Sequence, residues 1–336
     1  MISHGLIAAM LAAATLLSAP ASAAAPAAAP KRVQLVTLGT GGGPSDRLKR
    51  AHSSNAILVG EDIYIVDTGD GILRQLAAAD LPVEKIRAIF ITHHHFDHNA
   101  GLGPLLARRW LFGMMTGYQA IPVIGPPMTR DMVAGLAQAY RAVELAPITI
   151  GGPPTPPIAS TVDARDLPPE LQEPAVVYED ENVRVLAVLN DHYHFEPGSE
   201  AARLSRSYAL RFDTPARSIA FTGDTGPSAR VEAIARGADV LVSEVIDIER
   251  IEASLRSAND DPARRKFIDS LIEHLRLDHV TPPQVGEMAA RAGVGMVVLS
   301  HIVPGWDEET DMSVYTRGLD EHFKGPVHVA NDLDRF

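Results

Sequence analysis

The sequence predicts a single α/β domain over residues 31–336, behind a short N-terminal leader. Short apolar runs typical of buried strands alternate with segments of helical period. Several of these runs are followed directly by His or Asp, as in a site assembled at one edge of a sheet. The chain shows no linker after residue 30, and 46% of its residues are hydrophobic, which is ample for one large core.

The leader has the features of a secretory signal peptide. Residues 6–17 are apolar, and Ala21-Ser22-Ala23 is a small-x-small cleavage signature, so residues 1–23 are predicted to be removed. Residues 24–30 then form an Ala/Pro tether. The first five residues lack Lys and Arg, which leaves a retained membrane anchor as the alternative, although the apolar run is shorter than the roughly 20 residues of a spanning helix. We expect a periplasmic or secreted protein.

Composition restricts the chemistry and the partners. The chain contains no cysteine, which excludes thiolate zinc sites, disulfides and a cysteine nucleophile. Its net charge of −12 gives no general attraction for nucleic acid, whose binding depends largely on neutralised phosphates. We therefore expect a small-molecule substrate, no nucleic acid, and no membrane partner unless the leader is retained. A homo-oligomer remains possible.

The first part of the domain reads as strands followed by a helix. Residues 32–38 alternate polar and apolar side chains, which is typical of a half-buried strand, and end in a Gly-rich turn at 39–44. Residues 56–59 and 63–66 are predicted to form a hairpin, and residues 72–79 start as a helix. Between these last two elements Asp67 closes a strand, and we expect it to support a metal ligand or cap a helix.

The middle of the chain continues this alternation. An apolar run at 88–91 precedes predicted helices at 102–115 and 129–145, which flank a short strand at 121–124. Residues 151–174 contain seven prolines and are predicted to be a loop or excursion, because proline lacks a backbone donor and fixes φ.

The last part contains the remaining strands and a second excursion. Further strands are predicted at 183–188, 208–212, 218–221, 240–245 and 296–299. Residues 246–277 are charged and helical in period, so we expect a surface helical excursion over one end of the sheet. Thr281, Pro282 and Gln284 mark a helix start, with an N-cap, a proline at the first position and a capping-box partner.

The central motif is His93-His94-His95-Phe96-Asp97-His98, directly after the apolar run at 88–91. Residues i and i+2 of an extended chain point to one side, so His93 and His95 can bind one ion, while Asp97 and His98 can face a second. Neutral imidazole and carboxylate are ligands for zinc in sites that keep a position for water. His94 is expected to point away.

Three further candidate ligands each follow a short apolar run. They are His192, Asp224 and His301. Because strand ends meet at one edge of a sheet, we expect these residues to join the central motif. His194 lies two residues after His192 and on the same side of an extended chain, so it remains an alternative ligand.

These residues resemble the metallo-β-lactamase superfamily, and within it the ribonuclease Z-like branch that includes some secreted arylsulfatases and phosphodiesterases. The resemblance extends from about residue 33 to the end of the chain. It rests on residues 38–41, 67–71, 93–98, 192, 223–225 and 300–301. It implies a four-layer αββα sandwich, the metallo-β-lactamase fold, with a site for two Zn²⁺ at one edge.

The resemblance also implies roles for individual residues. One zinc ion would be held by His93, His95 and His192, and the other by Asp97, His98 and His301, with Asp224 bridging both. His279 in a His-x-Thr motif would protonate the leaving group, with Glu244 orienting it. The candidate catalytic residues are therefore Asp97, His279 and Glu244.

The function expected from these features is a secreted dinuclear-zinc hydrolase of small phosphodiester or sulfate esters. A shared hydroxide would attack phosphorus or sulfur. A lactonase using the same site is the main alternative, and a β-lactamase a lesser one, because those enzymes typically lack the bridging Asp. Activity on tRNA is not expected, because the leader, the charge of −12 and the absence of a basic arm between residues 101 and 192 all differ from ribonuclease Z.

Overall fold

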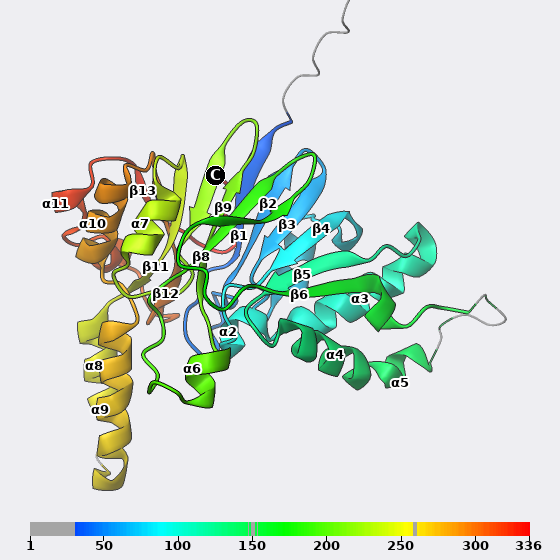
Figure 1. The fold of residues 1–336 in the computed structure, drawn as a ribbon. Helices are drawn as coiled ribbons and strands as arrows, with labels where there is room; N and C mark the ends of the chain where they lie inside the picture. The colour runs from blue at the N-terminus through cyan, green and yellow to red at the C-terminus, as the bar shows by residue number, and fades with distance from the viewer. Residues whose placement is uncertain (1–30, 147, 149–151, 153, 258–260) are drawn as a thin grey trace, which may run out of the picture. The chain divides into compact units, whose positions relative to one another are not determined.

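The computed structural model describes residues 31–336 apart from residues 147, 149–151, 153 and 258–260. The predicted signal peptide at 1–23 and the tether at 24–30 lie outside the described residues. The domain contains two β-sheets that pack face to face, with helices on the outer face of each sheet (Figure 1). This is the four-layer αββα sandwich expected from the sequence, so the predicted fold class is confirmed.

The first sheet has six strands in sequence order. The first three are antiparallel, and the remaining pairings are parallel. The strands are β1 (Val33–Gly39), β2 (Ser54–Val59), β3 (Asp62–Val66), β4 (Ile86–Phe90), β5 (Ile121–Gly125) and β6 (Val162–Asp166). The predicted hairpin joins β2 to β3, with Gly60 at a φ of 65° in its turn.

The second sheet has seven strands in the order β13-β12-β11-β10-β9-β8-β7. Its pairings are antiparallel from β7 to β10 and parallel from β10 to β13. The strands are β7 (Ala175–Glu179), β8 (Arg184–Leu189), β9 (Tyr208–Asp213), β10 (Ser218–Phe221), β11 (Val240–Ile246), β12 (Val297–Val303) and β13 (Val327–Val329).

Three apolar clusters hold these layers together. The central cluster lies between the two sheets and contains residues such as Ile57 and Leu210. Outside the first sheet, a second cluster packs its strands against helices through side chains such as Trp110. The helical elements on this side are α1 (Ile72–Ala78), η1 (Val83–Lys85), α3 (Leu102–Thr116), α4 (Thr129–Ala139), α5 (Arg141–Glu144) and η2 (Ile158–Thr161).

The third cluster covers the outer face of the second sheet. Its helical elements are α7 (Ala229–Ala235), α10 (Pro282–Ala292), η3 (Met312–Tyr315) and α11 (Leu319–His322). α10 begins as the sequence predicts, with a capping box between Thr281 and Gln284. Buried side chains at Val285, Met288 and Ala289 then follow the spacing of one helix face.

The range 151–174 differs from its prediction as a loop. η2 and β6 lie within it, and β6 pairs in parallel with β5 at the edge of the first sheet. The prolines of this range fall before residue 158 and after residue 167, so β6 itself contains none. An edge strand free of proline can therefore form in a segment whose overall composition indicates a loop.

The range 246–277 contains two helices, as its period predicts. They are α8 (Ile248–Ser257) and α9 (Pro262–Leu277), and they form an extended pair beside the second sheet (Figure 1). Two further short helices, α2 (Phe96–Asn99) and α6 (Glu200–Leu204), lie in loops that follow strands. Among the helices of the described chain, none is both long and apolar enough to cross a membrane.

Candidate metal centre

The candidate metal ligands lie where strands of the two sheets end, at one edge of the sandwich. β4 ends at Phe90, and His93 follows three residues later in the segment that leads into α2. On the second sheet, His192 follows β8, Asp224 follows β10, and His301 lies within β12. The structure thus brings together residues that are far apart in the sequence, as the strand-end pattern predicts.

All seven predicted ligands belong to two adjoining groups, in each of which the ligand atoms lie within 4.8 Å of one another. The first group contains His93, His95, His192 and Asp224. The second contains Asp97, His98 and His301. Each group therefore has the three or four His and carboxylate donors that a zinc site requires.

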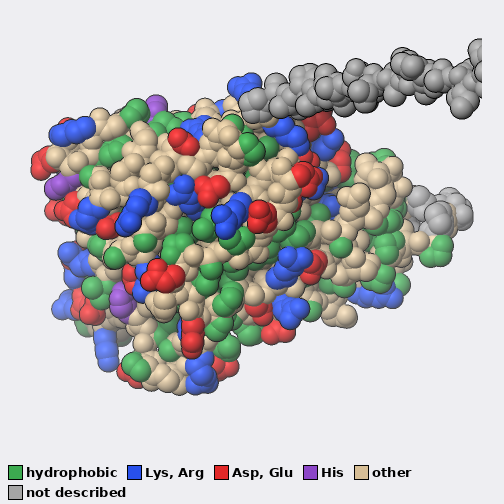
Figure 2. Space-filling model, turned by 45° about the horizontal axis from the view of Figure 1, so that its top comes forward, with side chains coloured by type: hydrophobic (Ala, Val, Ile, Leu, Met, Phe, Trp, Pro, Cys, Tyr) green, Lys and Arg blue, Asp and Glu red, His purple; other side chains and the backbone are tan. Residues whose placement is uncertain are grey.

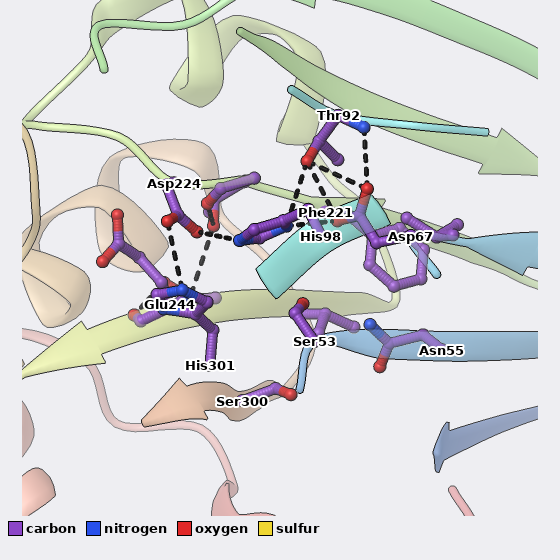
Figure 3. A pocket seen from close by; sticks show the side chains of 15 residues that line it. Ser53, Asn55, Asp67, Thr92, His98, Phe221, Asp224, Glu244, Ser300 and His301 are labelled. Carbon is purple, nitrogen blue, oxygen red and sulfur yellow. Dashed lines mark hydrogen bonds and ion pairs between the residues drawn. The ribbon is translucent and has the colours of Figure 1, made fainter. Parts of the chain in front are cut away.

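Asp224 contacts ligands of both groups, and Figure 3 shows it beside His98 and His301 of the second group. Its Oδ1 is 3.4 Å from His98 Nε2, and its Oδ2 is 3.1 Å from His301 Nε2. The same Oδ2 lies 3.7 Å from His93 Nε2 of the first group. This is the position that a carboxylate shared by two ions would occupy.

Several ligand atoms are buried without a hydrogen-bond partner among the residues that the structure describes. They include His93 Nε2, His98 Nε2 and Asp224 Oδ1. Buried polar atoms of proteins almost always have a partner, so their convergence here requires an explanation. Imidazole nitrogen and carboxylate oxygen are preferred zinc ligands, and the cluster is therefore compatible with a divalent metal ion such as zinc.

Burial keeps the three histidines of the first group neutral. It lowers the pKa of His93 and His192 well below the usual value for histidine, and that of His95 to about 4. A histidine binds metal through a neutral ring, so these three side chains are ready to bind at neutral pH.

In the second group, the neighbouring carboxylates favour the protonated, positively charged form of the histidines. Burial alone would lower the pKa of His301, but the carboxylates of Asp224 and Asp97 outweigh it and raise the pKa to about 10. The pKa of His98 is raised in the same way, against burial, by Asp224 and Asp67. The carboxylates thus attract protons to these rings, and a bound cation would replace those protons.

Further polar groups fix the orientation of the ligands. His98 Nδ1 lies 2.8 Å from Asp67 Oδ2, and Asp67 is itself held by the backbone N–H of Thr92 (Figure 3). His192 Nδ1 lies 2.9 Å from the backbone carbonyl of Asp278, to which it can donate. Metal-binding histidines commonly donate their second N–H in this way. The contact of Asp67 agrees with its predicted role as a support for a ligand.

The two other histidines near the motifs do not join the cluster. His194 lies outside both groups of ligands and makes a close contact with the Asp278 carboxylate. More than half of its side chain is exposed. His94 Nε2 faces Thr129 Oγ1 at 3.3 Å, away from the other ligands. The structure therefore places His192 rather than His194 at the site, and His94 outside it as expected.

The predicted acid pair also meets at this edge. His279 Nδ1 lies 2.6 Å from Glu244 Oε2, and both side chains are buried. The His279 ring stands 5.1 Å from the His192 ring and 6.0 Å from the His301 ring, measured between centroids. His279 therefore lies beside both groups of candidate ligands.

One histidine near the site was not identified by the sequence analysis. His274 of α9 lies 5.7 Å from the His192 ring, measured between centroids, and its Nδ1 is 2.5 Å from the carboxylate of Asp278. The signal that could have found it is the spacing of His274 and Asp278, four residues apart at the end of a predicted helix. It lay in a segment that was interpreted only as a surface excursion.

Residues 63–302 match the family described as the β-lactamase superfamily domain, which is more than half of the chain. The chain belongs to this family. Within the superfamily, the ribonuclease Z of Mycolicibacterium gilvum (strain PYR-GCK) is 28% identical over 313 residues, covering 90% of this chain and 95% of the relative.

Solved structures agree in fold. The metallo-β-lactamase fold protein YhfI from Bacillus subtilis has a TM-score of 0.61 at 17% identity and covers 90% of this chain and 98% of its own. Human tRNase Z, short form, has a TM-score of 0.59 at 21% identity, again with coverage of 90% and 98%. At these identities the two structures establish the fold alone.

The relatives correct two expectations. The match over nearly the whole length of a protein named ribonuclease Z overturns the expected hydrolase of small phosphodiester or sulfate esters. It also overturns the expectation of a small-molecule partner and no nucleic acid. The net charge of −12 was a poor guide to the partner, because it is a sum over the whole chain and does not describe the charge of any one surface. On the face drawn in Figure 2, Lys and Arg side chains lie among Asp and Glu side chains, so cationic groups remain available locally.

Proposed function

We propose that the protein is a metal-dependent ribonuclease that hydrolyses phosphodiester bonds of RNA, with tRNA precursors as the first class of substrate to test. The observation that carries the proposal is the convergence of all seven candidate ligands around Asp224, next to the His279–Glu244 pair. The similarity to a ribonuclease Z over 90% of the chain selects RNA as the source of the phosphodiester.

The two groups of ligands support a site for two divalent ions, and zinc suits their donors. When bound, such ions generate a nucleophile from water at neutral pH and neutralise charge that develops on phosphate oxygens. Asp224 would hold both ions, and Asp67 would keep the His98 ring in its binding orientation.

His279 suits the role of general acid for the leaving oxygen. Burial would lower its pKa, but the neighbouring Glu244 outweighs this effect and raises it, which favours the protonated ring at neutral pH. Glu244 Oε1 accepts a hydrogen bond from the backbone N–H of Thr225, while Oε2 faces His279. Because Nδ1 is engaged by Glu244, the Nε2 side of the ring is the one that can donate to substrate.

The test is cleavage of a labelled tRNA precursor by the zinc-loaded protein, with mature tRNA and a DNA strand of the same sequence as controls. We expect cleavage of the precursor at a defined position, and none by His95→Ala or after chelation. Cleavage of unstructured RNA at a similar rate would retain the ribonuclease and remove tRNA as its preferred substrate. If the wild type binds its metal and cuts no RNA, the proposal is wrong.

A further inference from the structure

His274, in the last turn of α9, lies at the rim of the metal centre. Its ring centroid is 5.7 Å from that of His192 and 6.3 Å from that of His95, both in the first group of candidate ligands. The ring of His279, which is proposed to protonate the leaving oxygen, is 5.6 Å away. About a third of the His274 side chain is exposed, at 34%, so the ring stands between the buried centre and the solvent from which a substrate arrives.

A buried carboxylate holds the His274 ring in place. His274 Nδ1 lies 2.5 Å from Asp278 Oδ2, and the backbone N–H of Asp278 donates to the carbonyl of His274 at 2.9 Å. The carbonyl of Asp278 also lies 2.9 Å from Nδ1 of His192. Asp278 is buried and directly precedes His279 in the chain. One residue therefore positions His274 relative to a candidate ligand and to the proposed acid.

The contact with Asp278 determines which nitrogen of His274 can meet a substrate. An ionised carboxylate only accepts hydrogen bonds, so Nδ1 of His274 carries the hydrogen in this contact. In the neutral ring, Nε2 then has a lone pair and no hydrogen. Within the described parts of the chain, Nε2 of His274 has no hydrogen-bond partner. His274 therefore presents a free acceptor beside the metal centre.

A free acceptor at this position suits one group of RNA in particular. Phosphate oxygens in a diester accept hydrogen bonds and do not donate them, so they do not pair with a neutral acceptor. The 2′-hydroxyl of ribose donates, and it lies on the same face of the sugar as O3′, on the neighbouring carbon. A substrate that offers O3′ to His279 thus brings this hydroxyl towards the adjacent ring of His274.

We propose that Nε2 of His274 accepts a hydrogen bond from the 2′-hydroxyl of the ribose whose O3′ leaves. The oxygen of water bonds to phosphorus as the P–O3′ bond breaks, O3′ takes a proton from His279, and the proton released by water restores His279. The 2′-hydroxyl keeps its own proton, so the products end in a 3′-hydroxyl and a 5′-phosphate.

This contact makes the site specific for RNA rather than DNA, because the 2′-hydroxyl is the group that DNA lacks. The inference rests on the proposed ribonuclease function. It adds to that function the residue that recognises the sugar, and it states which side of the phosphorus is cleaved.

The test compares kcat/KM of the metal-loaded protein on an RNA strand and on the same strand with one 2′-deoxy nucleotide on the 5′ side of the cleaved bond. We expect wild type to cleave the deoxy strand roughly five- to tenfold more slowly, the scale of one lost hydrogen bond. His274→Phe keeps a ring and removes the acceptor, so it should not distinguish the two strands. His274→Gln loses the ring and keeps an acceptor oxygen, so it should retain a preference for the RNA strand.

His194 provides a matched control. It contacts the other oxygen of the Asp278 carboxylate, and it lies outside both groups of ligands with more than half of its side chain exposed. His194→Phe therefore disturbs the same carboxylate without changing a ring of the centre. We expect this variant to keep the wild-type rate and the wild-type preference for RNA. Bound zinc is measured in every variant and should equal that of wild type.

A second measurement does not depend on cleavage. The Kd of the metal-loaded protein is measured for a fluorescent oligoribonucleotide that corresponds to the upstream product and ends in a 3′-hydroxyl. Wild type should bind it roughly fivefold more tightly than the same strand with a 2′-deoxy nucleotide at that end. His274→Phe should bind the two strands equally, and His194→Phe should behave as wild type.

The outcomes separate this inference from the proposed function. If wild type cleaves RNA and His274→Phe keeps the full preference for the RNA strand, the sugar contact is wrong and the ribonuclease stands. If wild type cleaves no RNA, the proposed function is wrong, and the product-binding comparison decides the contact: a preference that His274→Phe abolishes supports it, and no preference overturns it.

Three further results would also overturn the inference. Equal slowing of both strands by His274→Phe, with a weaker dependence on salt, would indicate a phosphate contact by a protonated ring. Loss of zinc from His274→Phe would assign the ring to the metal site instead. A product that ends in a 2′,3′-cyclic phosphate would mean that the 2′-hydroxyl attacks phosphorus rather than donating to His274.

Discussion

Glu244 Oε2 and His279 Nδ1 lie 2.6 Å apart beneath the edge where the candidate metal ligands meet. Glu244 comes from β11 and His279 from the segment before α10, so the contact joins two elements behind the metal centre. Both side chains are buried, and such a pair is costly to bury unless it is fully hydrogen-bonded. Its position beside His192 and His301 is the basis for the acid role proposed above.

Replacing His279 should therefore slow proton transfer to the leaving oxygen. We expect His279→Ala to lower kcat on RNA by about 10²–10⁴-fold, the usual contribution of a general acid, with metal content unchanged. A nucleotide p-nitrophenyl ester, whose leaving group needs no proton, should lose far less. Equal losses on both substrates would contradict the acid role.

Glu244→Gln should change the pH dependence of the reaction. Glu244 raises the pKa of His279, and a general acid is lost as pH rises through its pKa. Removing the negative charge lowers that pKa, so the alkaline limb of kcat should move to lower pH. The measurement is kcat against pH for both proteins at saturating RNA. A limb that stays in place or moves to higher pH would contradict this coupling.

Asp224 is the side chain that lies close to histidines of both groups of ligands. It lies within 3.7 Å of ring nitrogens of His93, His98 and His301, so its removal affects both proposed ions. We expect Asp224→Ala to lose at least one metal ion per chain and nearly all turnover. Metal-to-protein ratio and RNA cleavage would be measured together, with Asp131→Asn on the surface of α4 as control. Full activity with full metal content would exclude a bridging role.

His192 and His194 form a matched pair for testing the ligand assignment. His192 is fully buried in the first group of ligands, whereas His194 is more than half exposed and contacts Asp278. We expect His192→Ala to reduce bound zinc, and His194→Ala to retain it. Metal analysis of the two purified variants decides the point, and loss of zinc in His194→Ala alone would reverse the assignment.

The parts of the site that could be predicted from the sequence are those that depend on a short motif or on the residues directly after a strand. His93 to His98 form one continuous motif after a strand, and Asp224 and His301 each follow an apolar run. Because strand ends meet at one edge of a sheet, residues that directly follow strands can be predicted to lie close together. The same reasoning identified both sheets except for β6, β7 and β13, which are edge strands with few or no buried side chains.

The parts that could not be predicted depend on tertiary packing. His274 reaches the site only because α8 and α9 pack together and return the chain to the sheet edge. The positive φ of Asp67 and His301, at 60° and 47°, is likewise imposed by the surrounding fold. The substrate was mispredicted for a related reason, because net charge does not report where cations lie.

Asp180 links the two sheets and should contribute measurably to stability. Its Oδ2 accepts hydrogen bonds from Tyr64 of β3 at 2.7 Å and Tyr178 of β7 at 2.8 Å, and its Oδ1 accepts from two backbone N–H groups. Tyr64 is fully buried, so removal of its acceptor leaves a costly unpaired donor. We expect Asp180→Ala to lower the free energy of unfolding by about 1–3 kcal/mol. The neighbouring exposed Glu181→Ala should change it by less than about 0.5 kcal/mol.

The stabilising effect of Asp180 should also depend on pH. Burial would raise the pKa of this carboxyl, but the hydrogen bonds from Tyr64 and Asn182 outweigh it and lower the pKa. A carboxyl whose pKa is lower in the folded state stabilises above its unfolded pKa of about 3.9, and loses this effect as pH falls through the folded value. Urea unfolding of wild type and Asp180→Ala at pH 6 and pH 3 should therefore show a smaller gap at pH 3. A gap that widens on acidification would mean that the ionised carboxylate is not what holds the two tyrosines.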